Sequence, residues 1–460
     1  MRIQKIFETA KDTDRRISSV PVNGRIWTAN GGESCRITLG KTADGRKFNG
    51  FGGAVTESAG YIMSWLSPEK RAEIIDAYYG TAAGNGYVYA RTHLNSSDFS
   101  LENWACVPQK DESLGTFSME RTDKYLTPVL LDVQEKAGRE NFRLMVTPWS
   151  PPAWMKDNND MNNGGKLKPE YRQLWADYIT KFLTELKKRG LDTDIISIQN
   201  EPAAVQRWDS CIWSAEEEGI FAAEYLGPTF GKAGFGKTGI LVWDHNRDLL
   251  EERFSASMSL PGAEKYIAGA AYHWYSGDQY GNVRKCAEKF PEKQLVFSEG
   301  CIEGGARPGA WYSGERYAHN IINDLNSGCT AWIDWNLVLD MNGGPNHAGN
   351  YCDAPVLADV TKNEIHFQSS YYYIGHFSRF IRPGAVRIGL EMDAFMTPAT
   401  PDGKMGNMME ACAFRNKDGS TAVVISNRTE ADMVYILDTG TEKKTFFCPP
   451  RAIQTLTAGE

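Results

Sequence analysis

Eight short apolar runs, separated by longer segments with helical patterning, constrain the fold of this sequence more than any other feature. The runs cover residues 48–55, 87–94, 143–149, 195–200, 239–244, 266–275, 294–298 and 329–336. Strands that alternate with helices build βαβ units, in which the strands are parallel. Eight such units predict a closed (β/α)8 TIM barrel. An open doubly wound sheet is the alternative, but no Gly-x-Gly-x-x-Gly motif follows the first run.

The two ends of the chain follow a different pattern. Residues 378–460 alternate with a period near two between turn signals, and residues 2–45 contain similar short segments. This alternation is typical of antiparallel strands. We therefore expect an α/β protein in which 47–377 form the barrel. Segments 1–46 and 378–460 should pair into one accessory antiparallel β-sandwich.

Composition argues against several classes of protein. The 460 residues carry a formal net charge of -8 and no block of basic residues, so nucleic-acid binding is not expected. No apolar stretch reaches the roughly 18 residues that a transmembrane helix needs, so stable membrane insertion is not expected either. Residues 1–20 lack the apolar run of a signal peptide. The protein is expected to be soluble, and cytoplasmic as written, or secreted or periplasmic if a signal was removed.

Neither the cysteines nor the histidines indicate a metal or redox centre. The nine cysteines are widely spaced and form no Cys-x-x-Cys pair, so we expect buried thiols. His93, His245 and His273 lack the close spacing of a His-x-x-x-His metal motif. The sequence therefore predicts no metal and no cofactor.

Two glutamates end predicted strands. Asn200-Glu201-Pro202 ends the fourth run and Glu299 ends the seventh. Because the carboxyl ends of barrel strands form one face, both side chains should lie at the same mouth. Taken alone, Glu201 could instead begin a helix before Pro202, and Glu299 could be an exposed loop residue. As a pair they match the two carboxylates of glycoside hydrolysis, about 5–5.5 Å apart in retaining enzymes, of which the acid needs a raised pKa.

Other residues near strand ends are candidates for a sugar subsite. Asp98 follows the second run and could hold two adjacent hydroxyls of a sugar, or it could form an Asx turn. The amide of Asn200 could bind another hydroxyl. Aromatic residues end the third, sixth and eighth runs, and they are either core residues or sugar contacts: Trp149, His273-Trp274-Tyr275 and Trp335.

These positions carry a resemblance to glycoside hydrolase family 30, most closely to its acid β-glucosidase (glucosylceramidase) branch. The similarity extends from about Phe48 to Ile388. The matching motifs are Gly50-Phe51-Gly52-Gly53-Ala54, Ser97-Asp98-Phe99-Ser100, Thr147-Pro148-Trp149-Ser150-Pro151-Pro152-Ala153-Trp154, Asn200-Glu201-Pro202, His273-Trp274-Tyr275, Ser298-Glu299, Asp334-Trp335-Asn336-Leu337, Gly343-Gly344-Pro345-Asn346 and Gly375-His376-Phe377-Ser378.

The resemblance implies a barrel with a β-sandwich built from both chain ends. It also implies a retaining double displacement in which Glu201 is the acid/base and Glu299 is the nucleophile. Further residues are implied to bind the sugar of the −1 subsite or to line the pocket, namely Asp98, Trp149, Asn200, Tyr275, Trp335 and Asn350.

The expected substrate is a β-linked glycoside, oligosaccharide or glycolipid, and the leading hypothesis is a β-glucosidase or glucosylceramidase-like enzyme. An endo-β-1,6-glucanase, a β-xylosidase and a transglycosylase of the same family stay open. A non-catalytic carbohydrate-binding barrel is the alternative from another class, and the presence of both glutamates argues against it. His93, Gly300 and the segments 159–168 and 303–315 depart from the glucosylceramidase pattern, so the leaving group is not specified.

Overall fold

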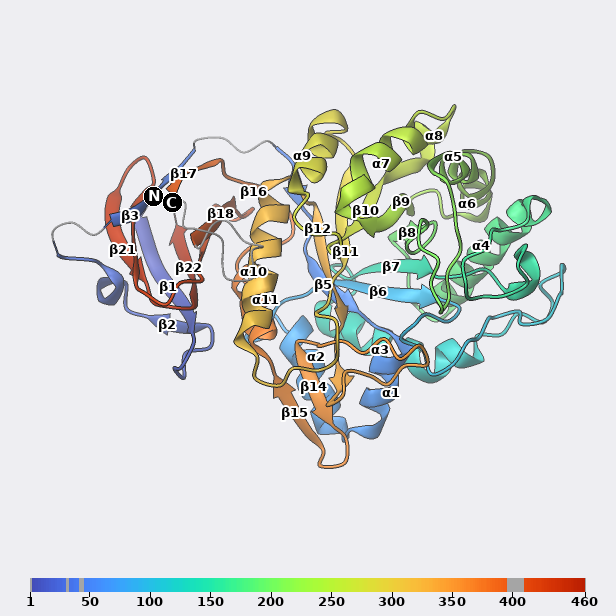
Figure 1. Cartoon of the computed structure of the whole chain (residues 1–460), viewed down its shortest axis with the longest axis horizontal. Coiled ribbons are helices and arrows are strands. Elements are labelled where there is room, and N and C mark those ends of the chain that lie inside the picture. The colour runs from blue at the N-terminus through green and yellow to red at the C-terminus, as the bar shows by residue number, and fades with distance from the viewer. Residues whose placement is uncertain (1, 30–32, 41–44, 395–408, 460) are drawn as a thin grey trace. The chain divides into compact units, whose positions relative to one another are not determined.

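The eight apolar runs form eight parallel strands that close into a barrel (Figure 1). The strands follow one another around the barrel in chain order, and the last pairs with the first. They are β5 (Phe51–Ala54), β6 (Tyr89–Leu94), β7 (Arg143–Pro148), β8 (Ile195–Ser197), β9 (Gly239–Asn246), β10 (Ile267–His273), β11 (Gln294–Glu299) and β12 (Ala331–Asn336). The predicted TIM barrel is therefore confirmed.

The computed structural model describes residues 2–29, 33–40, 45–394 and 409–459. These residues separate into two units. The barrel unit comprises Phe51–Pro308 and Ala331–His366, and the other unit comprises Met1–Gly50, Gly309–Thr330 and Phe367–Glu460.

The segments that connect the barrel strands contain helices. They are α1 (Glu57–Trp65), α2 (Pro68–Tyr79), α3 (Glu120–Ala137), α4 (Arg172–Lys188), α5 (Ala215–Ile220), α6 (Gly227–Ala233), α7 (Leu250–Met258), α8 (Ala263–Tyr266) and α9 (Tyr280–Lys289). In α4 the buried face includes Trp175, Ile179, Phe182 and Leu186, which recur at helical spacing. After β12, the strands β13 (Leu339–Asp340), β14 (Val356–Asp359) and β15 (Glu364–Phe367) form a small sheet.

The inside of the barrel is layered. Apolar side chains from seven of its strands, β6 to β12, and from the residue just before β6 form one cluster: Val88, Tyr89, Met145, Ile195, Leu241, Ala271, Val296, Ala331 and Ile333. Residues two positions further along a strand point to the same side of the sheet. Arg91, Thr147, Ser197, His273 and Ser298 occupy such positions, so a polar layer lies above the apolar one, at the carboxyl ends of the strands.

The second unit contains a seven-stranded and a four-stranded sheet. The first has the order β2 (Ser18–Val20), β1 (Arg2–Ala10), β22 (Ala452–Gly459), β19 (Thr421–Asn427), β18 (Met409–Arg415), β16 (Ala385–Arg387) and β4 (Lys47–Phe48). The second has the order β17 (Leu390–Ala394), β3 (Glu33–Leu39), β20 (Met433–Asp438) and β21 (Lys443–Cys448). Helices α10 (Trp311–Asn326) and α11 (Ser369–Ser378) belong to the same unit.

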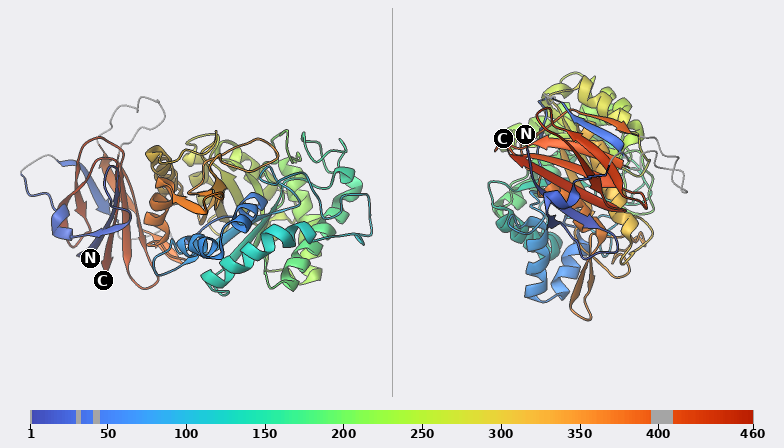
Figure 2. Two further views of the ribbon diagram at one scale, coloured as in Figure 1. Left: turned by 90° about the horizontal axis from the view of Figure 1, so that it is seen from below. Right: turned by 90° about the vertical axis from the view of Figure 1, so that its left-hand side faces the viewer.

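Strands from both ends of the chain build these sheets, as predicted. β1 pairs with β22 along its whole length, and the blue and red strands lie side by side in Figure 2. Pairing is antiparallel throughout except between β3 and β20, which run parallel. No hairpin joins these two strands, so chain connectivity does not impose an antiparallel direction on them.

All nine cysteines are buried free thiols, which confirms the sequence prediction. Within the described part of the chain, no helix has both the length and the apolar character needed to cross a lipid bilayer.

Candidate active site

One buried arginine organises the polar layer of the barrel. Arg91 lies on β6, and its side chain has no exposure to solvent. Its guanidinium donates to the oxygens of Glu299 at 2.5 Å, of Asn200 and Asp244 at 3.0 Å each, and of Thr147 at 3.3 Å. A buried charge is tolerated only when it is paired and hydrogen-bonded. The ends of four other strands therefore converge on this side chain.

A β-bulge turns Asp244 into the barrel. The register of β9 against β10 shifts by one residue after Trp243, so that Asp244 is the extra residue. Both residues have positive φ, 73° at Trp243 and 52° at Asp244. Bulges re-aim side chains and recur beside active sites. Here the carboxylate of Asp244 accepts hydrogen bonds from Arg91, Ser197 and Ser298.

The backbone at Glu201 is held in a strained conformation. Its φ is 47°, in the left-handed region that residues with a Cβ adopt at a cost of about 1–3 kcal/mol. Its N–H donates to the carbonyl of Asp244 at 3.0 Å, which fixes this geometry. Glu201 and Pro202 lie in a bend and a turn, and the next helix starts only at Ala215. The alternative of a helix start at Glu201 is therefore excluded.

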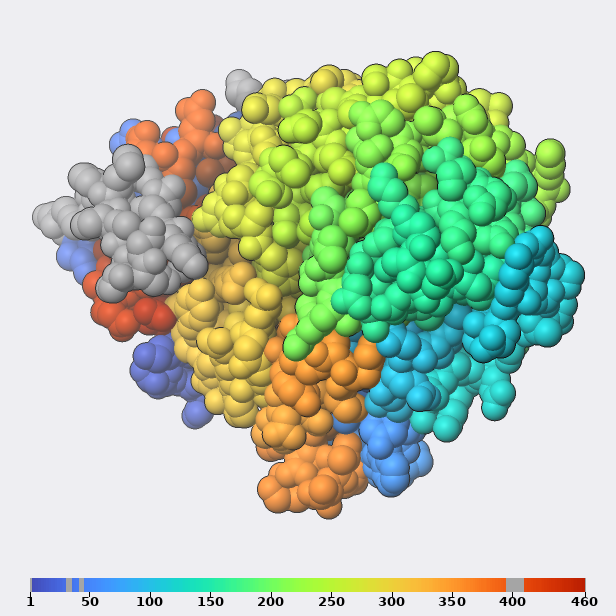
Figure 3. Space-filling model, turned by 45° about the vertical axis from the view of Figure 1, so that its right-hand side comes forward, coloured from blue at the N-terminus to red at the C-terminus, as the bar shows by residue number. Residues whose placement is uncertain are grey.

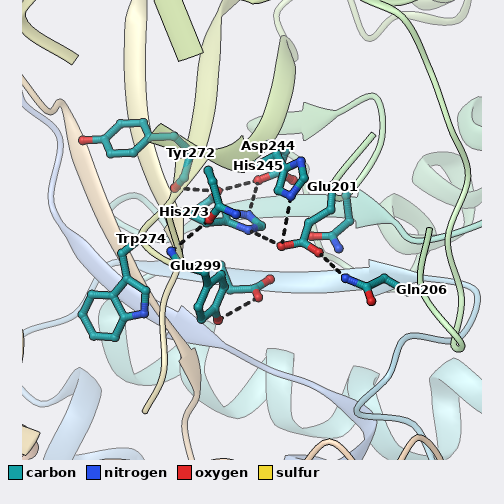
Figure 4. Close-up of polar contacts among 12 residues, drawn as sticks. Glu201, Gln206, Asp244, His245, Tyr272, His273, Trp274 and Glu299 are labelled. Carbon is teal, nitrogen blue, oxygen red and sulfur yellow. Dashed lines mark hydrogen bonds and ion pairs between the residues drawn. The ribbon is translucent and has the colours of Figure 1, made fainter. Parts of the chain in front are cut away.

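The two glutamates lie in one polar network, and their carboxylates face the same space (Figure 4). Glu201 Oε1 lies 3.2 Å from His273 Nδ1, and its Oε2 accepts from Gln206 at 3.3 Å. Glu299 ends β11, is only 7% exposed, and accepts from the phenol of Tyr275 at 3.1 Å. The structure thus brings together Glu201, Glu299 and Tyr275, each of which is a candidate site residue in the sequence analysis.

His273 links Glu201 to the centre of the polar layer. Its Nε2 lies 3.1 Å from Asp244, while its Nδ1 faces Glu201. Burial lowers the pKa of His273, but the charge of Glu299 and the contacts with Asp244 and Glu201 outweigh burial and raise the pKa to about 9. The imidazole is therefore a cation at neutral pH and donates from both nitrogens.

The two glutamates differ in the direction of their pKa shifts. Burial, together with the charge of Glu201, raises the pKa of Glu299 against the lowering effect of His273 and Arg91. At Glu201 burial also acts to raise the pKa, but the hydrogen bond from His273 and the charges of His245 and His273 lower it overall. The pKa of Glu201 is thus shifted in the direction opposite to the rise that we expected, because His273 faces this carboxylate.

The charges of the cluster favour the retention of a proton. Asp244, Glu201 and Glu299 oppose two cations, Arg91 and His273, which leaves one negative charge without compensation in a buried site. A buried uncompensated charge is costly, and a close carboxyl pair titrates as a unit. This imbalance favours protonation of one of the two glutamates, and the directions of their pKa shifts favour Glu299 over Glu201.

Asp98 and Asn350 form a second polar group near the pair. Asp98 Oδ2 accepts from the amide of Asn350 at 3.1 Å. Burial, followed by the charge of Glu299, raises the pKa of Asp98 to about 8. Among the described residues, Asp98 Oδ1 has no hydrogen-bond partner although it is buried. A ligand hydroxyl would satisfy this oxygen.

The predicted strand-end tryptophans pack against each other. Trp149 and Trp335 are each 2% exposed, and their rings stack with centroids 5.4 Å apart. Arg91 lies 4.8 Å and 5.3 Å from the two ring centroids. They form a buried wall beside the glutamates and not an open stacking platform. The amide oxygen of the adjacent Asn200 is occupied by Arg91, so its amide N–H is the group that can meet a ligand.

The histidine that departs from the family pattern has a structural role. His93 accepts from the N–H of Glu57 at 3.0 Å and contacts the carbonyl of Asn95 at 2.6 Å. Burial lowers the pKa of His93 to about 4, so the ring is neutral and its Nδ1 donates to Asn95. In the residues that the structure describes, no three His, Cys, Asp or Glu side chains are grouped so as to hold a metal ion.

The rim of the site is built from several loops that meet at Asp209. This residue bridges to Asn162 in the loop after β7, accepts from Ser96 after β6, and lies 3.4 Å from His347 after β12. Figure 3 shows this face, where the green and teal segments after β8 and β7 lie beside the orange segment after β12. The divergent segment 159–168 therefore contributes to the rim.

Sequence analysis missed the roles of Arg91, Asp244 and Gln206, and it considered His273 as an aromatic neighbour or a metal ligand. Two of these residues carried a usable signal. Arg91 is a charged residue within an apolar strand run, and Asp244 ends an apolar run in the same way as Glu299. Both would need a partner if buried. Gln206 lies in a loop without regular patterning, and nothing in the sequence distinguishes it.

Comparison with known proteins was made for the whole chain. A family model described as the glycosyl hydrolase family 30 TIM-barrel domain matches residues 48–381. A second, described as the glycosyl hydrolase family 30 beta sandwich domain, matches residues 384–456. Together the two models match residues of both units and cover the chain from residue 48 to residue 456 apart from residues 382 and 383.

Three similar proteins illustrate these matches. The crystal structure of SrfJ from Salmonella typhimurium is 33% identical, has a TM-score of 0.90, and covers 99% of each chain. The endo-beta1,6-glucanase BT3312 is 27% identical with a TM-score of 0.84, again over 99% of each chain. The lysosomal acid glucosylceramidase of Mus musculus is 31% identical over 428 residues, which are 89% of this chain and 80% of the relative.

The cationic state of His273 makes a prediction about stability. Because its pKa rises from 6.5 to about 9 on folding, its stabilising effect is complete below pH 6.5 and is lost as the pH rises through 9. His273→Gln should lower the free energy of unfolding by on the order of 3 kcal/mol at pH 6 and much less at pH 10. Unfolding followed by tryptophan fluorescence at both pH values measures this difference.

The exposed His366 provides a control, since His366→Gln should show the same small difference from wild type at both pH values. A stability loss in His273→Gln that does not change between pH 6 and pH 10 would contradict a charged His273.

Proposed function

The chain belongs to glycoside hydrolase family 30, and from this premise we propose that it cleaves a β-linked glucoside with retention, using Glu299 as nucleophile and Glu201 as acid/base. The observation that carries the proposal is the position of both carboxylates at the ends of β8 and β11, held in one network by Arg91 and His273. Glycoside hydrolysis with retention needs such a pair.

In the first step, an oxygen of Glu299 attacks the anomeric carbon and the bond to the leaving oxygen breaks. Arg91 and Tyr275 hold one oxygen each of this carboxylate and so fix its direction of attack. Glu201 donates a proton to the leaving oxygen. In the second step a water attacks the same carbon, Glu201 accepts a proton from it, and the bond to Glu299 breaks.

The proton retained by the glutamate pair is the one that this chemistry needs. The pKa shifts favour Glu299 as the carrier of this proton, whereas the reaction needs the proton on Glu201 and an ionised Glu299. Both arrangements contain the same number of protons, so the buried cluster stays neutral in each. A leaving oxygen that accepts a hydrogen bond from Glu201 favours the second arrangement. After glycosylation the charge of Glu299 is lost, and Glu201 can then ionise and act as a base.

The polar groups around the pair are suited to a sugar. Asp98 with its unsatisfied oxygen, the amides of Asn350 and Asn200, and the Trp149–Trp335 wall surround the space that the glutamates face. The names of two relatives, a glucosylceramidase and an endo-β1,6-glucanase, both specify a glucosyl unit. This supports glucose as the sugar bound next to Glu299.

The rim favours an apolar leaving group over a second sugar. Val205, after β8, and Tyr351, after β12, are large apolar side chains with exposures of 64% and 45%. Apolar residues exposed on the rim of a polar site suit an aryl or lipid aglycone. We therefore place a β-glucosidase of glucosylceramidase type first, and an endo-β-1,6-glucanase second because of the close structural similarity to such an enzyme.

The role of Glu299 can be tested by trapping the intermediate. An activated 2-fluoro-β-glucoside should add one sugar to the protein, and peptide mapping should find the sugar on Glu299. Glu299→Gln should take up no label and should lose more than about 10³-fold in turnover. Glu303→Gln, an exposed glutamate in the following loop, should behave as wild type. More than a tenth of wild-type turnover in Glu299→Gln would refute the assignment.

The role of Glu201 can be tested by varying the leaving group. A good leaving group needs no proton, so Glu201→Gln should be slowed less than about tenfold in forming the intermediate from a dinitrophenyl glucoside. The same variant should lose about 10²–10⁴-fold with an alkyl glucoside. Pre-steady-state rates on both substrates measure the difference. Equal losses on the two would exclude Glu201 as the acid.

The substrate class can be tested by product analysis on aryl β-glucoside, aryl β-xyloside, β-1,6-glucan and glucosylceramide. We expect glucose from the aryl glucoside and from the lipid, while the glucan and the xyloside stay intact. Short β-1,6 oligomers from the glucan, with weak activity on the aryl glucoside, would establish the endo-glucanase alternative. Glu299→Gln serves as the control for activity that does not arise from this site.

A further inference from the structure

Two cysteines lie side by side next to the glutamate pair. The sulfurs of Cys301 and Cys352 are 3.0 Å apart, and the residues are 3% and 1% exposed. Cys301 is the second residue after Glu299, and Cys352 is the second residue after Asn350. The pair therefore joins the two segments that carry the candidate nucleophile and one of the candidate sugar contacts.

Backbone contacts fix the two segments against each other. Glu303 and Cys352 form an antiparallel β-bridge, and the N–H of Asp353 donates to the carbonyl of Ile302 at 2.7 Å. The N–H of Cys352 also donates to Gly343 at 3.0 Å. Because the chain is held on both sides of the sulfurs, their proximity depends on the fold and not on one side-chain rotamer.

We propose that Cys301 and Cys352 are an oxidisable dithiol and that their conversion to a disulfide lowers the activity of the neighbouring site. A disulfide has its sulfurs about 2.05 Å apart, so its formation brings them closer by about 1 Å. The pair exists whether or not the proposed function is correct, while the effect on activity rests on that function.

A single tyrosine connects the dithiol to the nucleophile. The phenolic oxygen of Tyr275 lies 3.5 Å from Cys301 Sγ and 3.1 Å from the carboxylate of Glu299, to which it donates. On the other side, Asn350 donates to Asp98 at 3.1 Å. Movement of Cys301 towards Cys352 changes the contact between Tyr275 and Cys301. It also pulls on the segment that holds Asn350. Small displacements of positioning groups reduce rates by one to two orders of magnitude.

The oxidation needs a small hydroperoxide. One thiol loses its proton as its sulfur attacks a peroxide oxygen, the O–O bond breaks, and the proton passes to the leaving oxygen, so that a sulfenic acid forms and water or an alcohol is released. The second thiol then attacks the sulfenic sulfur, the S–S bond forms, and a second water leaves. The two cysteines lose two electrons, and the O–O bond gains them. A dithiol reductant reverses the reaction by exchange. Burial raises the pKa of Cys301, so its thiol is protonated at neutral pH until it reacts.

The experiment oxidises the full-length protein with hydrogen peroxide, blocks the remaining thiols with N-ethylmaleimide and maps the peptides. We expect a linked peptide that contains Cys301 and Cys352, together with a roughly tenfold loss of kcat/KM on the aryl glucoside. Dithiothreitol should restore the activity. Cys352→Ser should be insensitive to peroxide, whereas Cys412→Ser, at a buried cysteine in the other unit, should respond as wild type does.

Different results of this experiment would contradict the dithiol itself and its effect on activity. Recovery of both cysteines as blocked thiols, while other residues are oxidised, would overturn the dithiol. A linked peptide without loss of activity, or a loss that persists in Cys352→Ser, would overturn its effect on the site. If wild type cleaves none of the glycosides, the proposed function fails, but the peptide map of wild type still decides whether the disulfide forms.

Discussion

The ion pair between Arg91 and Asp244 is the contact on which the rest of the site depends. Both side chains have no exposure to solvent, and their charged atoms are 3.0 Å apart. Removing one partner of such a pair typically costs about 3–5 kcal/mol, because the other is left as a buried charge. The remaining donors of Arg91 reach Glu299 and Asn200, and Asp244 accepts from His273. Glu299 thus contacts this pair directly, and the carboxylate of Glu201 is linked to it through His273.

The geometry of the barrel brings this ion pair and its polar neighbours together. In a closed parallel barrel, inward positions recur every second residue, and successive positions form layers. The lower layer is apolar and gives the barrel its core. In the next layer the strands contribute Arg91, Thr147, Ser197, His273 and Ser298, so the polar residues meet where every strand ends. The polar site is therefore built directly on the apolar core of the barrel.

Register shifts in three strands change which side chains this layer presents to the site. The register shifts before Asp244 in β9, at Ser298 in β11 and at Trp335 in β12. Each shift inserts one residue at the carboxyl end of a strand, where it changes which side chains point inward. Together with the positive φ of Glu201, these features store strain at the site. The well-packed barrel below compensates for it.

The sequence by itself determined the barrel, the use of both chain ends in the β-sandwich, and the location of Glu201 and Glu299 at strand ends. These features follow from periodicity, which reflects local geometry and can be read along the chain. Only the tertiary structure decided that Asp244 turns inward, that Arg91 and His273 supply two cations, and that the pKa of Glu299 is raised while that of Glu201 is lowered. It alone placed Cys301 beside Cys352, 51 residues later. Those outcomes depend on contacts across the barrel between distant segments, and no local pattern encodes them.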